Sequence, residues 1–265
     1  MDAKYKTNYK VRMADADRFG ALKLSAMFEM LQEAATEDSL RIGVDAASLK
    51  PLGRGWVISK FFIEINRLPR WNERVYITTW PSVRSRIATD REFVAQTQSG
   101  ETLFSARSQW VLFDISTRRI AKLERVKQWD KIETEFVNAD DLDAQLEKPA
   151  PDSPSVSCDV RKNDIDINGH VNNSVYIVLA TQSLPDDFRK TPASVRIKFL
   201  EEIKPEEKVK SACRIAEGAT FHSIFNAQTN RECARINIAW RVVLACETPR
   251  VRVLWVYVIV YFNIT

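Results

Sequence analysis

The sequence lacks the motifs that mark several large enzyme classes. Its 265 residues contain no G-x-S-x-G nucleophile elbow and no H-E-x-x-H zinc helix. With only seven glycines, the chain has little material for a loop that cradles phosphate groups. Its four cysteines form no C-x-x-C pair, so neither a structural zinc site nor a disulfide framework is indicated. The sequence therefore predicts an activity that uses no cofactor and no metal ion.

The sequence also has only a small excess of positive over negative charge. The formal net charge is +4, far below the concentrated basic stripe of a nucleic-acid-binding protein, so no nucleic-acid partner is expected. Basic residues do recur in three short stretches, at 67–74, 84–91 and 118–127, which would suit an acidic partner such as a carrier protein. The alternative, and the more frequent outcome for any single stretch, is an ordinary solvated face in which cations mix with Asp and Glu.

Neither end of the chain carries a long apolar segment. The N-terminus has no apolar signal-peptide core and no Arg/Ser-rich transit segment, which predicts a cytoplasmic protein. Residues 253–262 form an unbroken apolar run of about ten residues, whereas a membrane span needs about 20. No stable membrane insertion is therefore expected. The run is either an extra buried strand or an extension without a selected role, and we favour the second.

What the sequence does contain begins with one amphipathic helix. Residues 25–42 place apolar side chains at helical spacing, and Ser25 can cap the start of the helix. The pattern then changes to the alternation of β-strands, at residues 59–65, 75–80, 92–98 and 103–114. One long helix followed by antiparallel strands with short turns indicates α+β organisation and disfavours a doubly wound nucleotide-binding sheet.

The same order of elements returns in the second half of the chain, which suggests an internal repeat. A helix is expected near residues 172–180, followed by strands near 195–202, 208–215 and 233–240. Residues 15–22 align with residues 164–171, and residues 60–65 align with residues 198–203.

A stretch rich in Asp, Pro and Ser lies between the two copies and is typical of a surface connection. We therefore expect four segments: an N-terminal domain at 1–137, a linker at 138–157, a C-terminal domain at 158–246 and an apolar tail at 247–265.

Histidine is rare, and only His170 and His222 can supply imidazole chemistry near neutral pH. His170 lies in a polar run, residues 164–173, directly before the second helix. Backbone N–H groups and the dipole at a helix start can stabilise the oxyanion formed when water attacks a thioester. The alternative is that this Asp/Asn-rich turn merely caps the helix. His222 lies in a strand-like segment without an acidic neighbour in sequence, which indicates a partly buried structural residue.

The two copies differ where the polar groups lie. In the alignment, Phe19 and Ala21 of the first copy face Asn168 and His170 of the second. A chain built in this way imitates a two-fold dimer whose paired sites have diverged. We therefore expect the second copy to keep the reactive site and the first copy to serve as packing or binding surface.

The run from residue 166 to residue 176, D-x-N-x-H-V-N-N-x-x-Y, resembles the signature of the acyl-acyl carrier protein thioesterases. The resemblance covers most of the chain, from residues 9–12 and 31–35 through 110–114 to about Trp240. It implies a tandem hotdog fold, in which each antiparallel sheet wraps a long helix. It also implies an acyl-binding N-terminal domain and hydrolysis of fatty acyl thioesters on acyl carrier protein, which ends chain elongation.

The resemblance further implies a role for each polar residue of the site. Asp166, Asn168 and His170 match the polar positions of the signature, and Glu202 matches a later catalytic glutamate, with Glu201 as the competing choice. In this interpretation, Glu202 activates water, while His170 and Asn168 orient the water or polarise the carbonyl. Asp166 orients one of these two side chains.

Other functions stay open beside this one. Some members of the family, chiefly the plant ones, carry a cysteine directly after the glutamate, and plant members also carry a plastid targeting extension. This chain has Ile203 at that position and no such extension, so it looks more like the bacterial branch. An acyl-CoA thioesterase or another hotdog acyl-thioester enzyme is the alternative within enzymes. A non-catalytic acyl-binding protein is the alternative from another class. The expected partner is acyl carrier protein, and a homodimer is left open.

Overall fold

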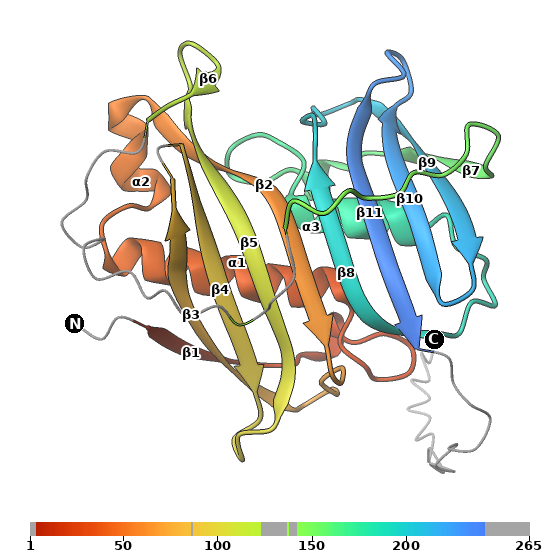
Figure 1. The fold of residues 1–265 in the computed structure, drawn as a ribbon, viewed down its shortest axis with the longest axis horizontal. Helices are drawn as coiled ribbons and strands as arrows, with labels where there is room; N and C mark the ends of the chain where they lie inside the picture. Colours follow the sequence, from red (N-terminus) through yellow and green to blue (C-terminus); the bar gives the residue numbers. More distant parts are fainter. Residues whose placement is uncertain (1–3, 86, 123–136, 138–141, 242–265) are drawn as a thin grey trace, which may run out of the picture.

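A long antiparallel sheet forms one layer of the molecule, and two helices cover one of its faces (Figure 1). The computed structural model describes residues 4–85, 87–122, 137 and 142–241. The sheet has 11 strands in the order β1-β3-β4-β5-β2-β8-β11-β10-β9-β7, and β6 pairs with β5. The N-terminal half holds β1 (Tyr5–Lys10), α1 (Leu24–Arg41), α2 (Ala46–Leu49), β2 (Arg54–Ile65), β3 (Arg74–Arg84), β4 (Ala88–Gln96), β5 (Thr102–Asp114) and β6 (Arg119–Ile120). The C-terminal half holds β7 (Ser155–Asp159), α3 (Asn173–Thr181), β8 (Thr191–Phe199), β9 (Lys208–Ala216), β10 (Ala219–Asn226) and β11 (Glu232–Arg241).

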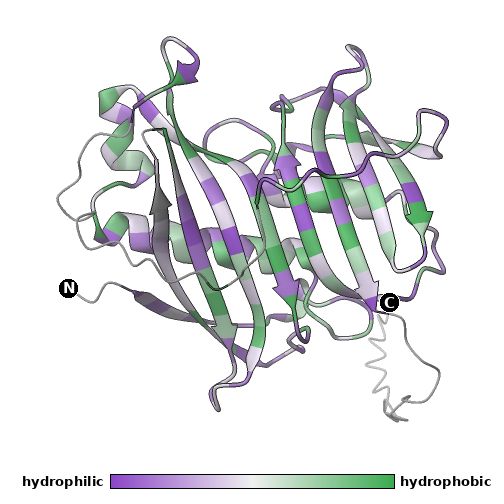
Figure 2. Cartoon of the chain, in the orientation of Figure 1, coloured by the Kyte–Doolittle hydropathy of each residue, from purple (hydrophilic) through white to green (hydrophobic). Residues whose placement is uncertain are grey.

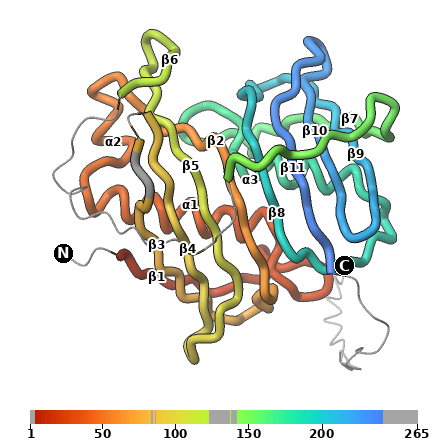
Figure 3. Tube along the Cα trace, viewed as in Figure 1, coloured from red at the N-terminus to blue at the C-terminus, as the bar shows by residue number. Residues whose placement is uncertain are grey.

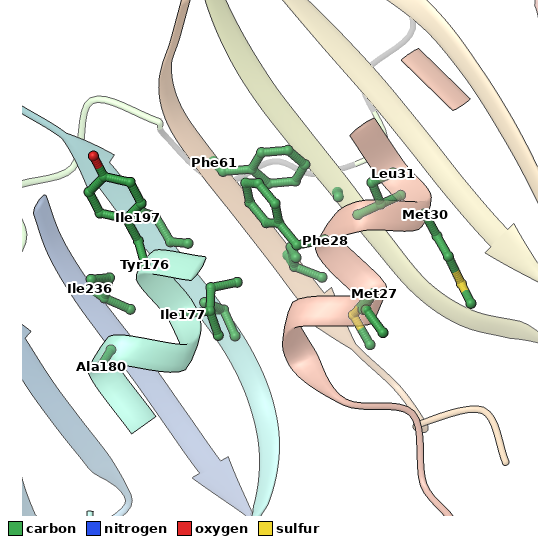
Figure 4. Packing of buried hydrophobic residues seen from close by; sticks show 14 of the residues in the cluster. Met27, Phe28, Met30, Leu31, Phe61, Tyr176, Ile177, Ala180, Ile197 and Ile236 are labelled. Carbon is green, nitrogen blue, oxygen red and sulfur yellow. The ribbon is translucent and has the colours of Figure 1, made fainter. Parts of the chain in front are cut away.

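Each half is an antiparallel sheet packed on a helix, which confirms the predicted α+β tandem hotdog fold. Hydrophobic and hydrophilic residues alternate along the strands, because each strand presents one face to the helices and one to the outside (Figure 2). Phe28 of α1 packs on Phe61 of β2, with ring centroids 4.4 Å apart, in a core that runs through both halves (Figure 4). Full burial of a phenylalanine stabilises the fold by about 1.5–3 kcal/mol.

The two long helices lie close to their predicted positions. Helix α1 buries Met27, Leu31 and Ala34, which share one face at helical spacing. The prediction that Ser25 caps this helix is wrong: the cap residue is Lys23, and its side chain makes no capping hydrogen bond. Helix α3 starts after Asn172, whose side chain accepts a hydrogen bond from the backbone N–H of Ser174.

Strands β2 and β8 join the two halves into one sheet. They pair antiparallel, with Lys60 directly opposite Lys198. Like charges in that position repel, and Asp143 forms an ion pair with Lys60. Asp143 belongs to the segment 142–154, which precedes β7 and runs across the sheet face opposite the helices (Figure 3). The neighbouring lysines hold the pKa of the Asp143 carboxyl below its usual range.

The repeat predicted from the sequence is visible in matching hydrogen bonds. The carboxylate of Asp17 accepts the N–H groups of Phe19 and Ala21, at 2.8 and 2.9 Å. That of Asp166 accepts the N–H groups of Asn168 and His170, at 2.8 and 3.2 Å. The loop alignment of residues 15–22 with residues 164–171 is therefore correct.

The second predicted alignment, of residues 60–65 with 198–203, is displaced by a few residues. In the N-terminal half, Leu103 O accepts from the N–H groups of Asn66 and Arg67, and in the C-terminal half Cys233 O accepts from those of Leu200 and Glu201. Asn66 therefore corresponds to Leu200, and two residues further along the chain Leu68 corresponds to Glu202. Letter matches along a strand cannot fix register, because the alternating pattern repeats every two residues.

None of the helices among the described residues has the length and apolar composition of a membrane span. The predicted apolar tail at 247–265 lies outside the described residues, and so do residues 138–141 of the predicted linker.

Candidate active site

Asp166 organises the loop that precedes α3. One of its carboxylate oxygens accepts the N–H groups of Asn168 and His170, and its backbone N–H donates to His170 O at 2.8 Å. Gly169 closes the turn with a φ of 81°, in the left-handed region that favours glycine. The Asn168 amide lies 3.4 Å from the second Asp166 oxygen. Asp166 thus acts on Asn168 and His170 chiefly through the backbone.

Glu202 comes to this loop from the far end of β8. The predicted strand at 195–202 starts and ends too late: β8 spans Thr191–Phe199, and the chain then turns toward α3. Two contacts fix the turn at Ile203, whose backbone N–H donates to the Tyr176 hydroxyl at 3.1 Å and whose carbonyl accepts from Val171 N at 3.4 Å. Tyr176 is buried, and burial raises the pKa of its hydroxyl.

The imidazole of His170 and the carboxylate of Glu202, the two groups expected to react, are in contact beside this turn. His170 Nε2 lies 2.8 Å from Glu202 Oε1, and the two side chains are 48% and 32% exposed. The second carboxylate oxygen of Glu202 lies 3.4 Å from Arg118 Nη2. Arg118 belongs to the hairpin between β5 and β6 of the N-terminal half, so both halves of the chain contribute to the site.

Glu201 points elsewhere. Its carboxylate pairs with Arg231 Nη1 at 2.7 Å, and no contact joins it to His170 among the described residues. Asn168 lies on the loop and is exposed to solvent. The structure therefore gathers Asp166, Asn168, His170 and Glu202 into one exposed cluster and leaves Glu201 at its edge.

The backbone N–H groups of this loop are already occupied. Residues 168–172 all donate within the fold: three to Asp166, one to Ile203 O and one to Asp164 O. We expected such groups to stabilise an oxyanion, but these five are not available for it without a rearrangement. The side chains of Asn168, His170 and Arg118 carry further N–H donors beside this loop.

His222 lies away from this cluster, inside the C-terminal half. It is fully buried and bridges Ser183 Oγ, at 3.1 Å from Nδ1, and Thr220 Oγ1, at 2.9 Å from Nε2. Burial lowers the pKa of its imidazole to about 4. The structural role predicted for His222 fits these contacts. The cysteines Cys158, Cys213 and Cys233 are also buried, and burial raises the pKa of each thiol.

Two residues of the candidate site, Arg118 and Tyr176, were not assigned to it from the sequence. Arg118 was one cation among several in a basic stretch, and nothing local indicates that it reaches the other half of the chain. Tyr176 was part of the signature but had no role. Among the described residues, no three His, Cys, Asp or Glu side chains gather as a metal site would require.

Comparison with known families matches both halves of the chain. Residues 2–126 match the acyl-ACP thioesterase N-terminal domain, and residues 147–242 match the acyl-ACP thioesterase C-terminal domain. The chloroplastic acyl-carrier-protein hydrolase FATB2 of Cuphea viscosissima is 25% identical over 264 residues. That alignment covers 89% of this chain and 62% of the plant protein, so the chain spans less than two thirds of this relative.

Solved structures show the same fold. An acyl-ACP thioesterase from Bacteroides thetaiotaomicron superposes with a TM-score of 0.82 at 20% identity, covering 91% of this chain and 98% of the other. The 12:0-ACP thioesterase of Umbellularia californica superposes with a TM-score of 0.81 at 19% identity, over 91% and 98% of the two chains.

Proposed function

Because the chain belongs to the acyl-ACP thioesterase family, we propose that it hydrolyses fatty acyl thioesters carried on acyl carrier protein. The single observation that carries this proposal is the 2.8 Å contact between His170 Nε2 and Glu202 Oε1, beside an exposed loop. A carboxylate and an imidazole at hydrogen-bond distance can hold a water molecule and move its proton.

In the proposed reaction, Glu202 is the general base. It takes a proton from water as the water oxygen attacks the thioester carbonyl carbon. The resulting oxyanion is stabilised by the side-chain N–H groups of His170 and Asn168. When the intermediate collapses, the C–S bond breaks, and the sulfur leaves as a thiol because Glu202 returns to it the proton taken from water. The products are a free fatty acid and the carrier thiol. Asp166 is a positioning residue, because it fixes the loop that carries both donors.

We place the acyl chain against α1 of the N-terminal half. The start of α3 touches this helix: Asn173 Nδ2 donates to Gln32 Oε1 at 3.3 Å, and Ser174 Oγ donates to Glu29 Oε1 at 2.9 Å. An acyl group that leaves the site in this direction would meet Met27 and the other apolar side chains of α1 (Figure 4). Methionine adapts easily to an inserted chain.

Release of free thiol from a purified acyl-acyl carrier protein tests the proposal directly. Hydrolysis is expected with the wild-type chain and lost in Glu202→Gln. Thiol release from acyl-CoA at an equal or higher kcat/KM would favour the acyl-CoA alternative. Binding of the acylated carrier without any thiol release would show a non-catalytic acyl-binding protein instead.

A further inference from the structure

An exposed surface lies on the hairpin that delivers Arg118 to the site. We call it the hairpin surface and define it by Leu52, Ile115, Arg119, Ile120 and Lys122. The three apolar members are 64%, 55% and 54% exposed. They are neighbours in space, because Ile115 N donates to Gly53 O at 2.8 Å and β6 pairs with β5 beside them. Gathered apolar side chains of this size on a surface commonly mark an interaction site.

The charge of this surface has one sign. Residues 115–122 read Ile-Ser-Thr-Arg-Arg-Ile-Ala-Lys, with three cations and no acidic residue. Arg118, Arg119 and Lys122 are all exposed. Apolar side chains surrounded by cations suit a partner whose own face is apolar and acidic, because complementary charge speeds the encounter and fixes the orientation.

The hairpin is held in shape without a partner. The Asp114 carboxylate accepts from Ser116 Oγ at 2.7 Å and from Thr117 N at 2.9 Å. These hydrogen bonds lower the pKa of Asp114 to about 2, so they persist across the working pH range. At the other end, Ala121 N donates to Leu112 O at 2.8 Å. A preformed surface loses little conformational entropy on binding.

Cations of the other basic stretches have different contacts. Arg67 is bound to Glu73 and Glu101, and Arg91 is buried against Asp38. Arg70 and Arg74 bond to Phe19 O and to Asn8 within the N-terminal half. The hairpin, by contrast, places Arg118 on the carboxylate of Glu202, so a partner seated on it lies beside the reacting groups.

We propose that the hairpin surface docks acyl carrier protein through an acidic, partly apolar face of the carrier. This inference rests on the proposed function and assigns it a partner surface. A thioester tethered to a carrier on this hairpin enters between Arg118 and the Asp166 loop. Arg119, Ile120 and Lys122 then serve carrier recognition, whereas Arg118 belongs to the hydrolytic site.

The test compares the Arg119→Glu/Lys122→Glu variant with a matched control, Lys208→Glu/Lys210→Glu. The control makes the same charge change on exposed residues of β9, toward the far edge of the sheet (Figure 1). For each protein, kcat/KM is measured with dodecanoyl-acyl carrier protein and dodecanoyl-CoA. The ratio of the two values is expected to fall by about tenfold in the hairpin variant and to stay near the wild-type value in the control. Ile120→Ser is expected to lower the ratio less, and it carries no charge change.

Binding is read independently from the anisotropy of fluorescently labelled apo-acyl carrier protein. Weaker binding to the hairpin variant supports the docking surface even if no protein releases thiol, an outcome that would refute only the proposed function. Equal carrier affinity and an equal kcat/KM ratio in wild type and hairpin variant would overturn the docking proposal while leaving hydrolysis intact. Equal loss in the β9 control would overturn it too, since net charge and not the hairpin would then explain the effect.

Discussion

Leu68 occupies in the N-terminal half the backbone position that Glu202 occupies in the C-terminal half. Each lies two residues beyond the first of two N–H groups that share one carbonyl, Leu103 O in one half and Cys233 O in the other. Leu68 packs against the core, whereas Glu202 meets His170. Together with Phe19 and Ala21, Leu68 makes the first copy apolar where the second copy carries the candidate site. The divergence inferred from the loop thus extends to the position of Glu202, the proposed general base.

Substitution of the two adjacent glutamates should have clearly different effects on kcat. Glu202→Gln removes the proposed base but keeps the shape of the side chain, so kcat is expected to fall by about 10²- to 10⁴-fold. Glu201→Gln breaks only the contact with Arg231 and is expected to stay within a few-fold of wild type. Steady-state rates of both folded variants decide the assignment, and an inactive Glu201→Gln would show that the roles are reversed.

Tyr176 should affect both stability and turnover. Tyr176→Phe leaves the buried N–H of Ile203 without its acceptor, which costs about 1–3 kcal/mol. Because Ile203 adjoins Glu202, kcat is also expected to fall. Tyr9→Phe is the control: it removes the hydroxyl that bonds to Glu37, at a position outside the site. Urea unfolding and kcat are measured for both. A loss of stability in Tyr176→Phe with unchanged kcat would show that Tyr176 does not position Glu202.

His222 should make the fold sensitive to acid. The pKa of its imidazole is about 4 in the folded chain against an ordinary value of 6.5, so between these limits the unfolded chain binds more protons. The contribution to stability is complete above about pH 6.5 and is lost as the pH falls toward about 4, to a total on the order of 3 kcal/mol. Urea unfolding across this range should show a weaker pH dependence in His222→Gln. An unchanged slope in His222→Gln would contradict this account.

The buried pair of Asp38 and Arg91 should be sensitive to the loss of one partner. The Asp38 carboxylate is fully buried and binds Arg91 and Arg41, both at 2.7 Å. Asp38→Asn leaves the Arg91 cation buried without its counter-charge, which is expected to cost about 3–5 kcal/mol. Glu101→Gln removes an exposed partner of Arg67 and should change the unfolding midpoint little. Similar midpoints for both variants would mean that Arg91 finds another partner.

The local part of the site was predictable from the sequence. The loop before α3 is built by contacts between Asp166 and residues two to four positions later, so its conformation depends on a short stretch of chain. Helix α1 was predictable for a similar reason, since its apolar face repeats at helical spacing. The repeat of Asp17 and Asp166 before the two helices also predicted that the halves share one fold.

Only the tertiary structure decided which distant groups join that loop. The turn that brings Glu202 to His170 depends on the Tyr176 hydroxyl and on the pairing of β8 with β11, which no sequence periodicity specifies. The contact of Arg118 with Glu202 depends on the pairing of β2 with β8, because that pairing places the N-terminal hairpin beside the C-terminal loop. An alternating strand pattern tells which face a side chain takes, but it does not tell which strand lies next to it or in which register. That choice is made by backbone hydrogen bonds and core packing over the whole sheet.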